Sequence, residues 1–308
     1  MSTSVIEVNN LHKRYRDQVA VEDVSFTVER GEIFGMVGPN GAGKTTTVEC
    51  VEGLRRPDRG SVSVLGLDPQ RDGTELRQRV GAQLQESELP SKLKVWEALD
   101  LYASFYRERT DWRPLMEALG LADKRNTRFG KLSGGQKQRL SIALALVGNP
   151  EVAILDELTT GLDPHARRDT WDLIESIRNR GVTVVLVTHF MEEAERLCDR
   201  VAVVDAGRII AMDSPAGLVS RIQSEQRVRF RPSAPLEDQL LTQLPEVRGV
   251  SRAGSQVVVT GTGNLVNAVV STLARRGIVA YDLRVEQSSL DDAFVALTGR
   301  PLDPATNE

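Results

Sequence analysis

Gly38 to Thr45 read GPNGAGKT and fit the pattern G-x-x-x-x-G-K-S/T in full. The short apolar run GEIFGMVG precedes this stretch, and KTTTVECVEGL, which has the pattern of a helix, follows it. Glycine permits backbone conformations that aim N–H groups at phosphate oxygens, and the positive end of a helix adds to the attraction. The stretch therefore predicts a strand, a phosphate-binding loop and a helix in that order.

The residue types of this loop predict a division of labour around a nucleotide and Mg²⁺. We expect Lys44 to place its charge on the β- and γ-phosphates, Thr45 to offer its hydroxyl to Mg²⁺, and Thr46 to reach the α-phosphate. The other phosphate-contacting positions are Gly38, Pro39, Asn40, Gly41, Ala42 and Gly43. A chance glycine turn is the alternative, and the full match with correct flanking elements disfavours it. The loop does not identify the class of nucleotide enzyme, but a guanine-reading NKxD is absent from the sequence.

Apolar runs elsewhere in the chain predict an α/β core with a parallel sheet. EVAILDE and VTVVLVTH are rich in β-branched residues, as central parallel strands are, and an amphipathic helix around RRDTWDLIESIRNRG, closed by Gly181, separates them. Alternating apolar and polar residues from Val5 to Val28 predict antiparallel strands. Charged, helical patterns occupy residues from about Glu86 to Val147.

Three polar side chains end the two central strands. Asp156 and Glu157 follow the first strand and His189 ends the second, and such ends gather beside the ligand in open α/β sheets. We expect Asp156 to serve Mg²⁺ through water, Glu157 to polarise the attacking water, and neutral His189 to bond the γ-phosphate or that water. A solvent-facing acidic strand end and a structural histidine are the alternatives.

Composition limits the remaining possibilities. The 308 residues are 40% hydrophobic and 27% charged, with a formal net charge of -4, which argues against general attraction to nucleic acid or anionic lipid. Cys50 and Cys198 are too few for a disulfide framework, so we expect reduced thiols, as in cytosolic proteins. The N-terminus has neither a basic nor an apolar region, so we expect no signal peptide. The longest apolar runs are too short to span a bilayer, so another chain would have to cross any membrane.

The motifs together resemble the nucleotide-binding subunit of an ATP-binding-cassette (ABC) transporter. Between about Val5 and Ala216 they occur in family order. They are the phosphate loop at Gly38–Thr45, LSGGQ at Leu132–Gln136, ILDE at Ile154–Glu157, TTGLD at Thr159–Asp163, and His189. LSGGQ, within KLSGGQKQRL, is expected to begin a helix and resembles a second phosphate-binding loop. The resemblance implies that it is half of a site whose other half belongs to a second copy.

The resemblance also implies roles for further residues. Tyr15 would stack on adenine, with a plain strand tyrosine as the alternative. Gln85, in VGAQLQES, would sense Mg²⁺ and couple to the membrane subunit, with Gln83 as its rival. Asp163 would lie in the loop that crosses between paired subunits. The residues that would contact the partner's ATP are Ser133, Gly134, Gly135 and Gln136.

Two departures from the family pattern stand out. Leu158 follows Glu157 where the family usually has proline, which would loosen the turn without removing any chemistry. The segment NTRFGKLSGGQ lacks an acidic residue that many fused exporters carry, so the contacts with the membrane subunits would differ in detail.

The sequence pattern changes near Gln223. A βαββαβ order predicts a small ferredoxin-like domain over residues 223–300, followed by a frayed tail at 301–308. The expected fold class is a P-loop ABC ATPase core over residues 1–222, with an antiparallel β-subdomain and a helical subdomain at about 86–147, plus this α+β domain. The close, DLRVEQSSLDDAFVALTGR, is similar to the tails of ATPase subunits from daunorubicin-resistance exporters, in which the membrane-spanning subunit is a separate chain.

The resemblance thus implies an ATP-hydrolysing subunit that pairs head-to-tail with a second copy, or a related ATPase, around two ATP molecules. It would act on the cytoplasmic face of the membrane with a separate permease, export drugs, antibiotics or lipophilic compounds, and touch neither the cargo nor nucleic acid. An importer ATPase and a soluble ABC ATPase acting on ribosomes or DNA are the alternatives.

Overall fold

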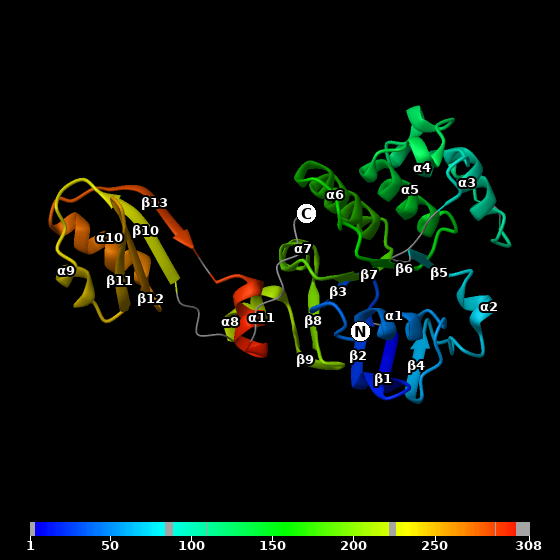
Figure 1. The fold of residues 1–308 in the computed structure, drawn as a ribbon, viewed down its shortest axis with the longest axis horizontal. Coiled ribbons are helices and arrows are strands. Elements are labelled where there is room, and N and C mark those ends of the chain that lie inside the picture. The colour runs from blue at the N-terminus through cyan, green and yellow to red at the C-terminus, as the bar shows by residue number, and fades with distance from the viewer. Residues whose placement is uncertain (1–3, 84–88, 109, 222–225, 287, 300–308) are drawn as a thin grey trace. The chain divides into compact units, whose positions relative to one another are not determined.

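The computed structural model describes residues 4–83, 89–108, 110–221, 226–286 and 288–299 (Figure 1). The chain divides into two compact units, the first reaching Pro215 and the second beginning at Ala216. The boundary predicted between residues 222 and 223 and the tail predicted at 301–308 lie outside the described residues. No helix within the described ranges is long and apolar enough to cross a membrane.

A six-stranded sheet in the order β5-β6-β7-β3-β8-β9 forms the centre of the first unit. The first five strands in this order, β5, β6, β7, β3 and β8, run parallel, and β9 pairs antiparallel with β8. The bounds are β3 Ile33–Val37, β5 Val80–Gln83, β6 Val152–Asp156, β7 Thr183–Thr188, β8 Arg200–Asp205 and β9 Arg208–Asp213. Every residue of β3, β6 and β7 is buried, as expected of strands that are apolar on both faces. The predicted parallel core is confirmed.

A second, antiparallel sheet in the order β2-β1-β4 completes the core of this unit. Its strands are β1 Ser4–Tyr15, β2 Gln18–Glu29 and β4 Arg59–Val64. The helix α1 (Lys44–Val51) packs against all three, and its buried Val48 and Val51 share one hydrophobic cluster with both sheets. The loop that precedes α1 is therefore held between two sheets.

Among the remaining helices of the first unit, α3, α4, α5 and α6 lie on the side of the six-stranded sheet opposite β1, β2 and β4 (Figure 1). The α-helices are α2 Gly73–Leu76, α3 Val95–Ala103, α4 Arg113–Ala118, α5 Gly134–Leu146, α6 Pro164–Asn179 and α7 Met191–Leu197, with 3₁₀ turns at Ala122–Lys124 and Phe129–Lys131. The segment predicted to be helical from about 86 to 147 thus contains α3, α4 and α5. α6 ends just before Gly181, whose φ of 91° suits only glycine well.

The second unit is ferredoxin-like, as predicted. Its sheet has the order β11-β12-β10-β13, with every neighbouring pair antiparallel. The elements are α8 Pro215–Arg221 at the boundary, β10 Gln226–Pro232, α9 Gln239–Thr242, β11 Val247–Ala253, β12 Gln256–Gly261, α10 Leu265–Arg275, β13 Ala280–Glu286 and α11 Leu290–Thr298. Buried Phe230 and Leu273 belong to the apolar cluster that holds α10 on the sheet.

Candidate functional site

The phosphate loop lies between β3 and α1 and depends on its glycines. Gly38 and Gly43 have φ values of 155° and 101°, and a side chain at either would collide with a backbone carbonyl, of Val204 and Ala20 respectively. No side chain caps α1, as suits a helix start whose first N–H groups bind phosphate. Residues 38–46, from Gly38 to Thr46, occupy this loop and turn.

Lys44 is buried within the loop that it serves. Its Nζ donates to the carbonyl oxygens of Gly38 at 2.7 Å and Pro39 at 2.9 Å. Burial lowers the pKa of Lys44, while the negative charges of Glu157 and Asp156 oppose that shift. The ammonium is therefore held where a phosphate would meet it.

Asp156 lies beside Thr45, across from the loop. The Thr45 hydroxyl is 3.3 Å from Asp156 Oδ2, whereas the buried Oδ1 has no hydrogen-bond partner. Burial raises the pKa of Asp156 to about 6, helped by the charge of Glu157. A buried carboxylate oxygen without a partner next to a hydroxyl fits Mg²⁺, which prefers oxygen ligands and retains water. Thr45 and Asp156 are the residues that would hold the ion.

Glu157 and His189 meet at the ends of β6 and β7. Glu157 Oε1 lies 3.3 Å from His189 Nδ1, and both side chains are mostly buried. Glu157 adopts φ 49°, a left-handed conformation that is unusual for a residue with a side chain. Leu158, the departure from the family pattern, is fully buried. The carboxylate and imidazole predicted from separate strands therefore form one pair.

LSGGQ begins α5, and its polar side chains cap that helix. The Ser133 amide donates to Gln136 Oε1 at 3.0 Å, and the Gln136 amide donates to Ser133 Oγ at 3.3 Å. This reciprocal capping box leaves Gly134 and Gly135 as the open part of the helix start. The turn thus presents backbone N–H groups rather than side chains, as an anion-binding helix terminus does.

LSGGQ and the TTGLD loop line one groove of about 540 Å³. Asp163 caps α6 at the other wall, where its Oδ1 accepts from the amides of His165 and Ala166 at 2.9 and 3.0 Å. Neither motif alone indicated that they would be adjacent. The groove is separate from the phosphate loop in sequence and contains the starts of α5 and α6.

An ion pair that the sequence did not reveal braces this groove. Arg139 of α5 donates to Asp169 of α6 at 2.6 Å, and His165 Nδ1 lies 3.5 Å from the same carboxyl group. All three residues line the groove. His165 is therefore part of the groove. The only signal was the helical spacing of His165 and Asp169, four residues apart.

Tyr15 ends β1 and keeps 37% of its surface exposed. The Lys13 ammonium lies 5.6 Å and the Arg55 guanidinium 5.9 Å from its ring centroid. An exposed ring flanked by cations suits stacking with a flat, electron-rich base. Gln85 lies outside the described residues, so its predicted role stays a prediction; its rival Gln83 is buried in β5.

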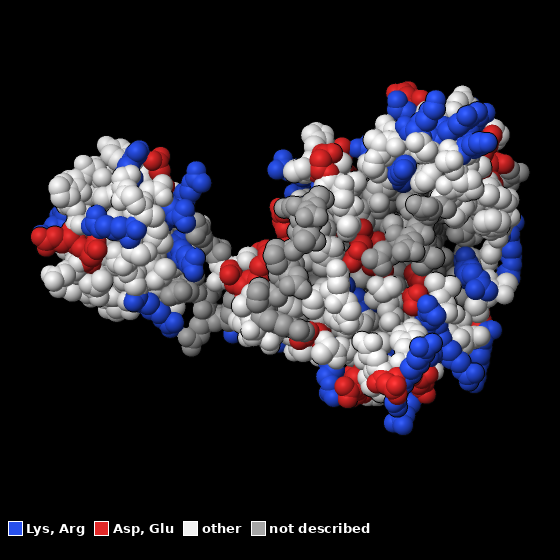
Figure 2. Space-filling view, in the orientation of Figure 1, with Lys and Arg blue, Asp and Glu red and all other residues white. Residues whose placement is uncertain are grey.

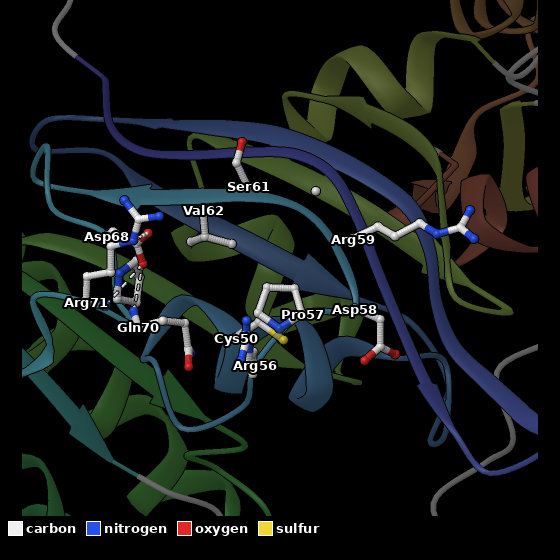
Figure 3. A pocket seen from close by; sticks show the side chains of 12 residues that line it. Cys50, Arg56, Pro57, Asp58, Arg59, Ser61, Val62, Asp68, Gln70 and Arg71 are labelled. Carbon is white, nitrogen blue, oxygen red and sulfur yellow. Dashed lines mark hydrogen bonds and ion pairs between the residues drawn. The ribbon is translucent and has the colours of Figure 1, made fainter.

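A second cavity, of about 560 Å³, lies at the far end of α1 between Cys50, Pro57 and Val62 (Figure 3). Burial raises the pKa of Cys50 to about 11, so its thiol is protonated at neutral pH. Cys50 and Cys198 are both free and buried. Acidic and basic side chains are mixed over the face of the first unit that Figure 2 shows.

Glu52, at the end of α1, is expected to make the stability of the folded chain depend on pH. Its carboxyl group is buried, Oε2 has no partner, and burial raises its pKa to about 8, with Asp156 and Glu49 adding to the shift. Because the folded pKa lies above the unfolded value, the stability from Glu52 declines as pH rises from about 4.5 to 8. We expect Glu52→Gln to remove that decline, on the order of a few kcal/mol. Urea unfolding at pH 5 and pH 8.5 measures the free energy of unfolding. If that free energy falls between the two pH values as much in Glu52→Gln as in the unaltered chain, the assignment of this pH dependence to Glu52 is wrong.

The chain is similar to known proteins of one family. The family described as ABC transporter matches residues 21–160. A Nod factor export ATP-binding protein I from Burkholderia orbicola is 44% identical over 224 residues, 71% of this chain and 74% of that protein. Another, from Rhizobium johnstonii, is 37% identical over 309 residues, 98% of this chain and 97% of that protein.

Solved structures show the same fold. An ATP-binding subunit of an ABC transporter has a TM-score of 0.64 and 30% identity, covering 70% of this chain and 92% of its own. The dimeric bacterial cassette MJ0796 has a TM-score of 0.60 and 27% identity, covering 68% of this chain and 98% of its own. Both cover about the share of this chain that the first unit occupies.

Proposed function

The chain belongs to the ABC transporter family as an ATP-binding subunit that hydrolyses ATP, and we propose that it powers export through a separate membrane-spanning subunit. The observation that carries the proposal is the relationship to Nod factor export ATP-binding proteins over nearly the whole chain, including the second unit. We place it on the cytoplasmic face of the membrane, held there by that subunit.

The pair Glu157–His189 supports a mechanism of hydrolysis in which the carboxylate acts on water. Glu157 accepts a proton from the water that attacks the γ-phosphate, and His189 fixes the carboxylate or the phosphate. Lys44 moves its hydrogen bonds from the loop carbonyls to phosphate oxygens. Thr45 and Asp156 would hold Mg²⁺, which would supply positive charge to balance that of the phosphates. Tyr15 stacks on adenine, and Gln85 links the site to the membrane subunit.

The groove between LSGGQ and Asp163 supports a head-to-tail dimer. It is a second set of anion-attracting helix termini in a chain that already has a complete phosphate loop. In the proposed dimer, each ATP lies between the phosphate loop of one copy and the groove of the other. ATP favours the closed state because it binds that state better, and hydrolysis releases it. The solved relative MJ0796 is dimeric.

Export is favoured over import by the export names of the relatives. The similarity of the C-terminal sequence to daunorubicin-resistance exporters also supports small-molecule cargo such as drugs, antibiotics or lipophilic compounds. The membrane subunit would select that cargo, and this chain would not touch it. The formal net charge of -4 argues against general attraction to the nucleic acid of a ribosome or to DNA.

Co-expression with the membrane protein encoded beside this chain tests the proposal. We expect the two to co-purify, the ATPase rate to rise in the complex, and inside-out vesicles to accumulate a lipophilic dye when ATP is added. ATP-driven loss of dye from those vesicles would indicate import. Co-purification with ribosomes or DNA in place of a membrane subunit would contradict transport altogether.

A further inference from the structure

α6 and α7 enclose a buried carboxyl group that the proposed mechanism does not use. Glu193 of α7 is fully buried, and its Oε1 accepts a hydrogen bond from Trp171 Nε1 of α6 at 3.1 Å. Its Oε2 has no hydrogen-bond partner. Burial raises the pKa of Glu193; the neighbouring side chains of Thr188, Trp171 and Thr159 oppose that shift, and the positive charge of Arg167 opposes it less strongly. A buried carboxyl oxygen left without a hydrogen-bond partner destabilises the folded chain.

Arg167 of α6 is the complementary unpaired group. Its Nε is buried without a hydrogen-bond partner, and its guanidinium carbon lies 4.6 Å from the centroid of the Phe190 ring. The Arg167 amide donates to the Asp163 carbonyl oxygen at 3.0 Å. Arg167 therefore lies one helical turn from the residue proposed to cross between the two copies.

Phe190 extends this series of contacts to the catalytic pair. Its ring centroid is 4.1 Å from that of His189, and the Phe190 amide donates to Thr188 Oγ1 at 3.0 Å. His189 in turn lies 3.3 Å from Glu157. Within one chain, contacts thus lead from Asp163 through Arg167 and Phe190 to His189.

We propose that Arg167 is a positioning residue that couples the start of α6 to the orientation of His189. The inference rests on the proposed dimer, in which the second copy acts on Asp163 and the start of α6. Because a buried donor and a buried acceptor of opposite charge attract, a shift of α6 that brings Arg167 Nε to Glu193 Oε2 is favourable. That shift would move the guanidinium relative to Phe190 and so reorient His189. Closure of the dimer would then reach the catalytic pair through a side chain that touches no nucleotide.

Arg167→Met tests the proposal, with Arg168→Met as the matched control. Arg168 is the exposed neighbour on the same helix. We expect Arg167→Met to lower kcat roughly tenfold, while KM for ATP and ATP-dependent dimerisation stay within about twofold. Arg167→Lys keeps the charge but loses the planar group and Nε, so it should show the same loss of kcat as Arg167→Met. Arg168→Met should match the unaltered chain.

Glu193→Gln separates coupling from packing, because the amide oxygen still accepts from Trp171. We expect the same selective loss of kcat, and no further loss in the double variant with Arg167→Met, because both changes remove one interaction. Additive losses, a normal kcat in Arg167→Met, or a parallel loss of dimerisation and kcat would overturn the proposal. If Arg167→Met does not fold, Phe190→Leu and Phe190→Tyr take its place. Only the tyrosine keeps the ring, so Phe190→Leu should lower kcat and Phe190→Tyr should not, and equal rates in the two variants would overturn the proposal. An unaltered chain that does not dimerise with ATP would overturn the proposed function instead.

Discussion

Glu157→Gln is expected to lower kcat for ATP hydrolysis by about 10²- to 10⁴-fold, the usual contribution of a general base. The amide has nearly the shape of the carboxylate, so contacts with His189 and the nucleotide change little, but it cannot accept the proton of the attacking water. ATP affinity should therefore stay close to normal, and the ATP-bound dimer should persist. Phosphate release measures the rate, and size-exclusion chromatography with ATP measures the dimer.

Glu151→Gln provides the matched control for this substitution. Glu151 directly precedes the opposite end of the same strand and pairs with Arg79 at 2.6 Å and Arg30 at 3.0 Å, away from the phosphate loop. The same chemical change there should leave kcat unaltered. A Glu157→Gln chain that hydrolyses ATP at the normal rate would remove Glu157 from the mechanism.

Ser133→Arg is expected to abolish ATP-dependent dimerisation and turnover while leaving ATP binding to the single chain largely intact. The large cation would enter the groove of about 540 Å³ that a second copy's ATP has to occupy. The phosphate loop is formed by other residues and does not include Ser133. Equilibrium binding of a fluorescent ATP analogue and light scattering with ATP measure the two properties separately.

The cap at Ser133 makes a second control necessary. Ser133 Oγ accepts from the Gln136 amide, so any substitution that removes the hydroxyl also costs α5 about 1 kcal/mol. Ser133→Thr keeps the cap, and Ser133→Ala removes it without filling the groove. If Ser133→Ala loses dimerisation as completely as Ser133→Arg, loss of the hydroxyl rather than filling of the groove explains the result. Loss of ATP binding in Ser133→Arg would contradict the separation of the two half-sites.

The polar strand ends of the candidate site were predictable from sequence because strand and loop signals fix them locally. GPNGAGKT between a strand and a helix, and Asp156, Glu157 and His189 at strand ends, need only the rule that parallel strands end together. The ferredoxin-like unit followed from the order of its patterns in the same way. The hairpin of β8 and β9 went unpredicted, although Ala206 and Gly207, with φ of 46° and 78°, form its turn.

Side-chain partners far apart in the sequence could not be predicted. Nothing in KLSGGQKQRL shows that Arg139 reaches Asp169 thirty residues on. The bond from Trp171 to Glu193 depends on how α6 packs on α7. Such pairs are set by tertiary packing, which a motif does not encode.

Mixing two inactive variants tests the shared site most directly. Lys44→Ala should weaken ATP binding at the phosphate loop, and Ser133→Arg should block the groove, so neither variant alone should turn over ATP. In a head-to-tail pair of one copy of each, both defects fall in one site, and the other site has an intact phosphate loop and an intact groove. We expect ATPase activity to return on mixing and to rise with the fraction of mixed dimer. No activity at any mixing ratio, with both variants folded, would contradict a site shared between two copies.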